Sequence, residues 1–120
     1  MKKILIVDDE PNIIMSLEYT FKKSNFKVFI ARDGQEALDI LETETPDAII
    51  LDVMMPNVDG YTTIQEIKKQ EKLNQCKVIF LSAKTNPADI EKGLSLGADA
   101  YVTKPYSIKK LVQQVEELLT

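Results

Sequence analysis

Carboxylates follow two short apolar runs of the chain. Asp8 and Asp9 come directly after residues 4–7, and Asp52 comes directly after residues 48–51. Three carboxylates within about 5 Å of one another repel by roughly 3 kcal/mol per pair at an effective dielectric constant near 20. A divalent cation would remove this repulsion, and a set of oxygen ligands favours Mg²⁺, Mn²⁺ or Ca²⁺ over zinc. If the fold brings these residues together, we expect an acidic, metal-binding site, with Mg²⁺ as its cofactor.

Two further polar residues stand at the ends of apolar runs. Ser82 ends the fourth run and Lys104 follows the fifth. The chain has no histidine, which excludes a Ser-His-Asp triad, a His-ligated zinc and a phosphate carried on histidine. Any phosphoryl chemistry would therefore rest on carboxylates, hydroxyls and lysines.

A single Asp after an apolar run is more often a loop residue or a helix cap than a functional group. Asp59 precedes Gly60 and is predicted to cap the third helix. Asp33 with Gly34 is predicted to form a turn. The acids at the ends of the first and third runs, together with Ser82 and Lys104 at the same predicted edge, are harder to explain in this way.

The elements that must position these residues alternate along the chain. Five short runs rich in β-forming residues predict strands at 4–7, 28–30, 48–51, 78–81 and 100–102. Apolar residues at helical spacing follow each run and predict five helices, the clearest being the last. Asn86 and Ser107 are predicted to cap the fourth and fifth helices, and Gly97 to end the fourth. The continuous apolar character of the runs indicates a parallel sheet covered on both faces, with all strand carboxyl ends at one edge.

Length and composition narrow the class of protein. A chain of 120 residues with 44% hydrophobic and 28% charged residues is typical of one globular domain, here residues 1–120. No apolar run approaches the roughly 20 residues that a membrane span needs, and the start of the chain does not resemble a signal peptide. The net charge of −4 argues against direct binding to nucleic acid or an anionic membrane. The single Cys76 excludes an internal disulfide and favours the cytoplasm.

Five short motifs carry a resemblance to a known family. They are Ile6-Val-Asp-Asp-Glu10, Leu51-Asp-Val-Met-Met-Pro-Asn-Val-Asp-Gly60, Leu81-Ser-Ala83, Gly97-Ala-Asp-Ala-Tyr101 and Lys104-Pro105. In this order and spacing they resemble the receiver domain of bacterial two-component response regulators, chemotaxis receivers included, over essentially the whole chain. The resemblance implies a flavodoxin-like α/β fold, a doubly wound five-stranded parallel sheet in the order 2-1-3-4-5 with five helices.

The resemblance also assigns roles to the acidic residues and the lysine. Asp52 would be the phosphoacceptor, attacking the phosphorus of a donor phosphohistidine to form an aspartyl phosphate. Asp9, Asp52 and the backbone carbonyl of Met54 would bind Mg²⁺ directly, and Asp8 would act through water. Lys104 would pair with the phosphoryl group.

Two more residues resemble the parts of a switch. Ser82 would hydrogen-bond the new phosphoryl oxygen, and Tyr101 would turn inward when Ser82 shifts. This movement would change the face formed by the fourth helix, fifth strand and fifth helix. The resemblance also implies a cis peptide bond between Lys104 and Pro105.

The implied function is a phosphorylation-dependent switch in two-component signal transduction. Its donor would be a sensor histidine kinase or a histidine phosphotransfer protein, and its output a downstream protein or a fused output domain. A phosphorylation-dependent homodimer is a further option. Receivers that drive winged-helix DNA-binding domains carry paired charges on the switch face, and the corresponding residues here do not form that set: Ile90, Ala100, Lys110 and Gln114. Ile90 and Tyr106 are predicted to be exposed and to form a docking patch for a partner.

Two alternatives use the same topology. A Mg²⁺-dependent phosphatase with an Asp nucleophile usually needs a second acid two residues later, but Met54 occupies that position. The chain is therefore not expected to be an enzyme beyond its own phosphorylation and dephosphorylation. A flavin-binding protein would need a hydroxyl- and glycine-rich loop after the first strand, where this chain has acids. The kinase, the target, and whether the chain is a complete protein or part of a longer regulator stay open.

Overall fold

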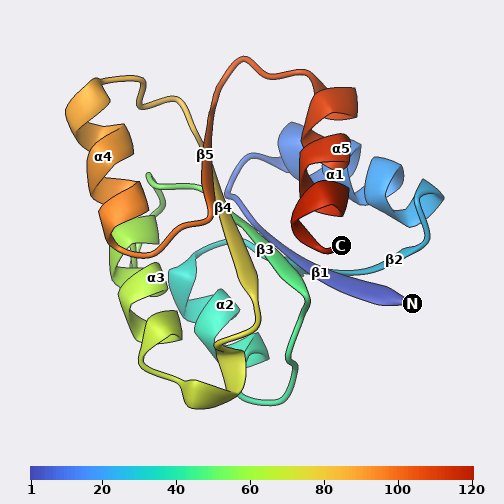
Figure 1. Ribbon diagram of the computed structural model, residues 1–120, viewed down its shortest axis with the longest axis horizontal. Coiled ribbons are helices and arrows are strands. Elements are labelled where there is room, and N and C mark those ends of the chain that lie inside the picture. Colours follow the sequence, from blue (N-terminus) through green and yellow to red (C-terminus); the bar gives the residue numbers. More distant parts are fainter.

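Strands and helices alternate along the chain in the computed structural model, which describes all 120 residues (Figure 1). The strands are β1 (Lys2–Val7), β2 (Phe26–Ala31), β3 (Ala48–Leu51), β4 (Lys77–Ser82) and β5 (Ala100–Thr103). The helices are α1 (Pro11–Lys23), α2 (Gly34–Ile40), α3 (Gly60–Lys68), α4 (Pro87–Ser95) and α5 (Ile108–Leu118), and Glu71–Leu73 forms a short 3₁₀ turn. The predicted strands and helices are all present, and every strand except β3 extends a little beyond its apolar run. None of the helices combines the length and apolar character of a membrane-spanning segment.

The five strands form one parallel sheet in the order β2-β1-β3-β4-β5. The predicted flavodoxin-like fold is thus confirmed. Val7, the last residue of β1, pairs with Ala31 of β2 on one side and with Leu51 of β3 on the other. The residues that follow β1 and β3 therefore leave the sheet next to each other, at the same edge.

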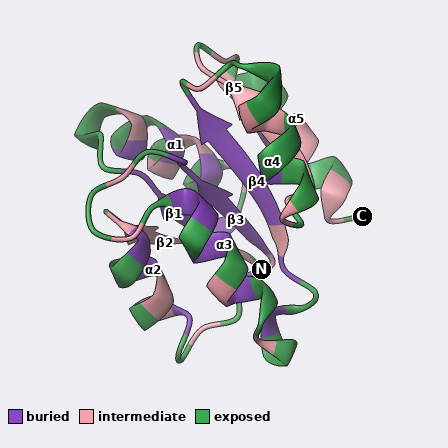
Figure 2. Cartoon of the chain, turned by 90° about the vertical axis from the view of Figure 1, so that its left-hand side faces the viewer, coloured by how far each residue is buried: buried purple, intermediate pink, exposed green.

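Each strand buries side chains on both faces of the sheet. Along β1, Leu5 and Val7 belong to one core cluster, and Ile4 and Ile6 belong to the other. Helices α2, α3 and α4 lie over the first face, and α1 and α5 cover the second (Figure 1). Figure 2 shows buried strands between helices whose outer surfaces are exposed. Burial on both faces explains why the strands read as continuous apolar runs rather than as alternating ones.

The predicted caps of three helices are confirmed. Asp59 accepts a hydrogen bond from the backbone N–H of the third residue of α3, and Asn86 and Ser107 cap α4 and α5 in the same way through their side chains. Gly97 has a φ of +110° just after α4, a left-handed conformation in which glycine is favoured, so the predicted end of this helix is also confirmed.

The prediction of a turn at Asp33 and Gly34 was wrong, because these residues begin a helix. Asp33 is the N-cap of α2, and its carboxylate accepts a hydrogen bond of 2.9 Å from the backbone N–H of Glu36. Glu36 in turn accepts from the backbone N–H of Arg32 at 3.0 Å. These two bonds from backbone N–H groups to side chains stabilise the start of a helix at Gly34, where the sequence had predicted a turn.

The predicted exposed patch on the switch face is also wrong. Ile90 and Tyr106 are both half-buried, whereas Leu94 of α4 is 45% exposed. Gly93 is the buried residue of this helix, and Ile90 lies one turn before it on the same side. Leu94, which follows Gly93, is the more exposed large apolar side chain of this helix.

Candidate functional site

The acidic residues continue the strands at the carboxyl edge of the sheet. Asp8 follows β1, and its backbone N–H donates a hydrogen bond of 3.1 Å to the carbonyl oxygen of Ala31 at the end of β2. Asp52 follows β3, and its backbone N–H donates to the carbonyl oxygen of Val7 at 3.0 Å. The ladder of hydrogen bonds between the strands thus extends into the site and holds these two residues beside each other.

The three carboxylates converge as predicted. Asp8, Asp9 and Asp52 each offer an oxygen, and these oxygens all lie within 4.8 Å of one another. Asp8 and Asp52 are only 2% and 6% exposed, whereas Asp9 is exposed to solvent. Two buried carboxylates and one open to solvent form an all-oxygen ligand set, which suits a hard divalent cation that keeps part of its water shell. The residues present therefore fit Mg²⁺.

Lys104 brings the one positive charge to these acids from the loop after β5. Its Nζ lies 3.2 Å from Asp8 Oδ2 and 3.5 Å from Asp52 Oδ2. The peptide bond between Lys104 and Pro105 is cis. With Asp9 included, one lysine faces three carboxylates, so the site has a net negative charge that a divalent cation would balance.

Burial and neighbouring charges shift the pKa values of Asp52 and Lys104. Burial raises the pKa of Asp52 to about 6, the charge of Asp8 adds to this rise, and Lys104 opposes it. Burial lowers the pKa of Lys104, but the charges of Asp52 and Asp8 outweigh this effect and raise it above its ordinary value. Lys104 is therefore charged at neutral pH. In the metal-free protein, the negative charge of the buried Asp52 carboxylate is the unfavourable one.

A cavity of about 240 Å³ lies over Asp52 and contains the residues predicted to act on it. Its lining comprises Asp9, Glu10, Asp52, Met54, Ser82, Ala83 and Lys104. The Ser82 side chain is completely buried, and its Oγ accepts a hydrogen bond of 3.1 Å from the backbone N–H of Lys84. The serine hydroxyl therefore has a proton to donate toward a group bound in the cavity.

Tyr101, on β5, contacts the segment that follows Ser82. It is half-buried, and its hydroxyl donates a hydrogen bond of 2.9 Å to the carbonyl oxygen of Lys84. Ser82 and Tyr101 thus contact the two backbone groups of the same residue. The loop between β4 and α4 connects the two residues that the sequence assigned to a switch.

A larger cavity next to the site involves residues to which the sequence analysis gave no role. It has a volume of about 590 Å³ and shares Asp9 and Met54 with the smaller cavity. Tyr61 and Lys92 also line it. A sequence signal for Tyr61 existed, because this aromatic residue lies three positions before Ile64 on the buried side of α3.

The metal-free protein is expected to become more stable when Asp52 is replaced with Asn. A folded-state pKa of about 6 means that native Asp52 binds its proton more tightly than the unfolded chain does, so the free energy of unfolding falls as pH rises from about 4 to above 6. Asp52→Asn removes this loss, while Asp8 keeps Lys104 paired. We expect the variant to gain about 1 to 3 kcal/mol at pH 7.5 and little at pH 4.

Urea denaturation in the presence of a metal chelator measures this difference at both pH values. Added Mg²⁺ should then stabilise the unmodified protein more than the variant, because only the former keeps all three carboxylates. A variant that is less stable at pH 7.5 without metal would show that Asp52 is not a destabilising buried charge.

Comparisons with known proteins agree with this geometry. The sequence profile of the response regulator receiver domain matches residues 4–116. The alkaline phosphatase synthesis transcriptional regulatory protein PhoP of Bacillus subtilis is 42% identical over 118 residues, which cover 98% of this chain and 48% of that protein. The chain thus spans about half the length of this curated relative.

Solved structures give the same result. The receiver domain of Francisella response regulator 1452 superimposes with a TM-score of 0.91 at 34% identity, covering 99% of this chain and 97% of that one. The receiver domain of a sensor histidine kinase from Pseudomonas aeruginosa PAO1 superimposes with a TM-score of 0.90 at 29% identity, covering 98% and 97%. That second structure has a magnesium ion coordinated in its active-site cleft.

Proposed function

Because the chain belongs to the receiver-domain family of two-component response regulators, we propose that it is a phosphorylation-dependent signalling switch with Asp52 as its phosphoacceptor. Phosphorylation of a receiver by a histidine kinase, followed by action on an output partner, is the general function of this family. The observation that carries the assignment of Asp52 is its position in the cavity. It is the buried carboxylate that both faces Lys104 and lines the cavity with Ser82.

Asp9, Asp52 and the backbone carbonyl of Met54 would hold Mg²⁺ directly, and Asp8 would act through water. The support for this is the all-oxygen cluster within 4.8 Å and the place of Met54 in the cavity lining. When bound, the ion would neutralise the carboxylates and the oxygens of the incoming phosphoryl group. Asp8 is the most buried of the three acids, and Lys104 already pairs with it, which leaves Asp9 as the most open ligand.

In the transfer step, a carboxylate oxygen of Asp52 would attack the phosphorus of a phosphohistidine on the donor protein. A new O–P bond forms, the N–P bond breaks, and the imidazole of the donor leaves and takes up a proton. Lys104 would remain beside the acceptor and pair with a phosphoryl oxygen, and the Ser82 hydroxyl would donate a hydrogen bond to another. The chain would carry out its own phosphorylation and dephosphorylation and turn over no other substrate.

The switch itself would involve Ser82 and Tyr101. Both residues contact the backbone of Lys84, so a shift of Ser82 toward a phosphoryl group would move the loop on which the Tyr101 hydroxyl rests. Since this loop leads into α4, the face formed by α4, β5 and α5 would change shape. That face would then act on a downstream protein or a fused output domain, or form a homodimer.

The other partners follow from the family and the charge. The donor would be a sensor histidine kinase or a histidine phosphotransfer protein in the cytoplasm. A net charge of −4 gives no basic footprint for direct binding to nucleic acid. Any effect on transcription would therefore pass through another domain or protein.

Replacing Asp52 with Asn is expected to abolish phosphorylation. With Mg²⁺ and acetyl phosphate, the unmodified protein should gain one phosphate per chain, stable to acid and labile to base, as measured by intact mass. Asp39→Asn is a matched control, since Asp39 is an exposed acid on α2, away from the cluster. Undiminished labelling of the Asp52 variant would overturn the assignment.

A further inference from the structure

Tyr61 connects α3 to α4 at the side of the phosphoacceptor. This residue is 8% exposed, and its hydroxyl donates a hydrogen bond of 3.1 Å to the carbonyl oxygen of Asp89 in the first turn of α4. The Nζ of Lys92, one turn later, lies 4.4 Å from the centre of the Tyr61 ring. A side chain of α3 therefore holds α4 by its backbone and by a neighbouring charge.

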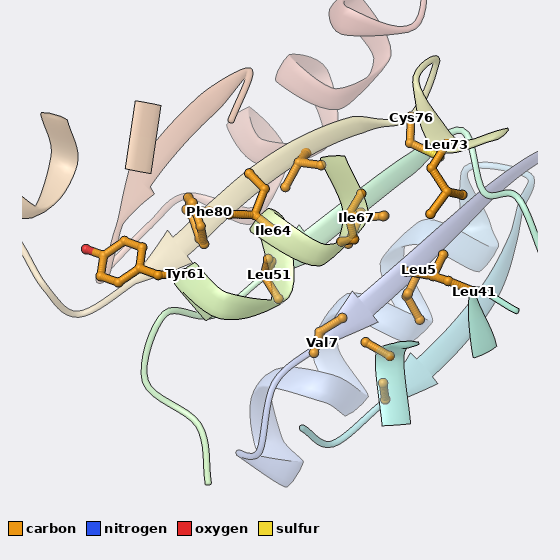
Figure 3. Close-up of a cluster of buried hydrophobic side chains, with 14 of the residues drawn as sticks. Leu5, Val7, Leu41, Leu51, Tyr61, Ile64, Ile67, Leu73, Cys76 and Phe80 are labelled. Atoms are coloured by element: carbon orange, nitrogen blue, oxygen red, sulfur yellow. The ribbon is translucent and has the colours of Figure 1, made fainter. Parts of the chain in front are cut away.

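Tyr61 and Tyr101 both pack against Phe80, and both bond to the segment between β4 and α4. The centre of the Phe80 ring on β4 lies 5.7 Å from each of the two tyrosine rings. Figure 3 shows Tyr61 and Phe80 side by side at one end of the core cluster. The two hydroxyls bind carbonyl oxygens at Lys84 and Asp89, which bracket the loop and the helix start between β4 and α4. Burial, with contributions from Tyr101 and Asp89, raises the pKa of Tyr61 to about 12, so its hydroxyl keeps the proton that it donates.

Helix α4, which receives the bond at Asp89, packs directly on the aromatic rings. A Cβ built on Gly93 would lie 3.0 Å from Phe80 and 3.0 Å from Tyr101, closer than carbon atoms normally pack. Glycine at this position therefore allows α4 to approach the rings. A small displacement of a ring would therefore displace the helix, because Gly93 has no side chain between the helix backbone and the rings.

Tyr61 is also tied to the phosphoacceptor through its own neighbour. The backbone N–H of Gly60 donates a hydrogen bond of 2.9 Å to the carbonyl oxygen of Val53, and Gly60 packs directly against the carbonyl oxygen of Asp52. The start of α3 is thus in backbone contact with the residues that would move when Asp52 is modified. A continuous path of contacts leads from Asp52 through Gly60 and Tyr61 to α4.

We propose that Tyr61 is a positioning residue of the switch, which couples the backbone at Asp52 to the start of α4 through its hydrogen bond to Asp89. It works in parallel with Tyr101, which couples Ser82 to the same segment. The inference rests on the proposed phosphorylation of Asp52, but it concerns a path that does not pass through Ser82. Two anchors on one segment would make α4 respond to the phosphate as a unit.

Removing the Tyr61 hydroxyl is expected to reduce the response of α4 to phosphorylation. Tyr61→Phe keeps the ring and its packing on Phe80 but loses the bond to Asp89. The readout is the change in backbone amide chemical shifts of residues 88–95 when Mg²⁺ and acetyl phosphate are added, divided by the labelled fraction. One lost hydrogen bond changes a two-state equilibrium by about two- to tenfold, so for an α4 that is evenly divided between two states the shift changes should fall by about a third to four fifths.

Three further variants frame this result. Tyr19→Phe removes the hydroxyl of an exposed tyrosine on α1 and should respond as the unmodified protein does. Tyr101→Phe should leave a partial response, and the double variant at positions 61 and 101 should show almost none. A full α4 response in labelled Tyr61→Phe protein would overturn the coupling role alone. An unmodified protein that takes up no phosphate would instead refute the proposed function on which the role rests.

Discussion

Replacing Asp9 with Asn is expected to weaken Mg²⁺ binding about ten- to a hundredfold, equivalent to about 1.4 to 2.8 kcal/mol. The rate of phosphorylation of Asp52 at a limiting Mg²⁺ concentration should fall by a similar factor. Asp9 is the exposed acid of the cluster, so its replacement removes one charged ligand and leaves the two buried acids with Lys104. The effect should therefore appear in metal binding rather than in folding.

Isothermal titration with Mg²⁺ measures the affinity, and it suits a chain without tryptophan, which offers no strong intrinsic fluorophore at the site. Asp39→Asn removes the same charge from a distant position and should leave the affinity unchanged. Removal of Mg²⁺ by a chelator should stop labelling of the unmodified protein altogether. Equal affinity in the Asp9 variant and the unmodified protein would exclude Asp9 as a ligand.

The second large effect is expected at Gly60. A Cβ at this position would overlap the carbonyl oxygen of Asp52 and lie 2.8 Å from Val53 Cα. Both obstacles are backbone atoms, which cannot rotate away as a side chain can. Gly60→Ala should therefore lower the free energy of unfolding by about 2 to 4 kcal/mol. It should also slow phosphorylation, because the loop that carries the acceptor must move to make room.

Gly97→Ala is the matched control. Gly97 has a φ of +110°, so the substitution imposes a backbone cost, but the nearest atom to its Cβ is the flexible end of Lys68 at 2.9 Å. About 1 kcal/mol is expected there, with little effect on labelling. Urea denaturation of both variants in chelator, together with phosphate uptake by each, separates the two cases. If Gly60→Ala lowers the free energy of unfolding no more than Gly97→Ala does, the loop that carries Asp52 can move aside at little cost.

Much of the fold could be predicted from the sequence because local patterns reflect local physics. Continuous apolar runs predicted strands buried on both faces, and all five strands were confirmed. The caps at Asp59, Asn86 and Ser107 were confirmed because a cap needs only its own helix start. Asp33 was misassigned because a hydrogen bond from the backbone N–H of Glu36 to its side chain, which caps α2, was not considered. The strand order followed from the family resemblance, since apolar runs do not specify which strands pair.

The acidic cluster was predictable for a topological reason. Parallel strands place their carboxyl ends at one edge, so Asp8 and Asp52 had to meet if β1 and β3 were neighbours. The roles of these residues in metal binding and phosphorylation are proposals that the variants above test. Lys104, which comes from the far end of the chain, joined the cluster at 3.2 Å only through the folded sheet.

The sequence by itself thus determined the strands, most helix boundaries and the gathering of the acids, because these depend on each segment and on one rule of topology. Only the tertiary structure decided how α4 rests on the sheet. It buried Gly93 against Phe80 and Tyr101, half-buried Ile90, and turned Leu94 outward. It also directed the Tyr61 hydroxyl to α4. The physical reason is that the face a helix buries, and the rings it meets there, depend on the packing of several elements at once, which the pattern of one segment does not contain.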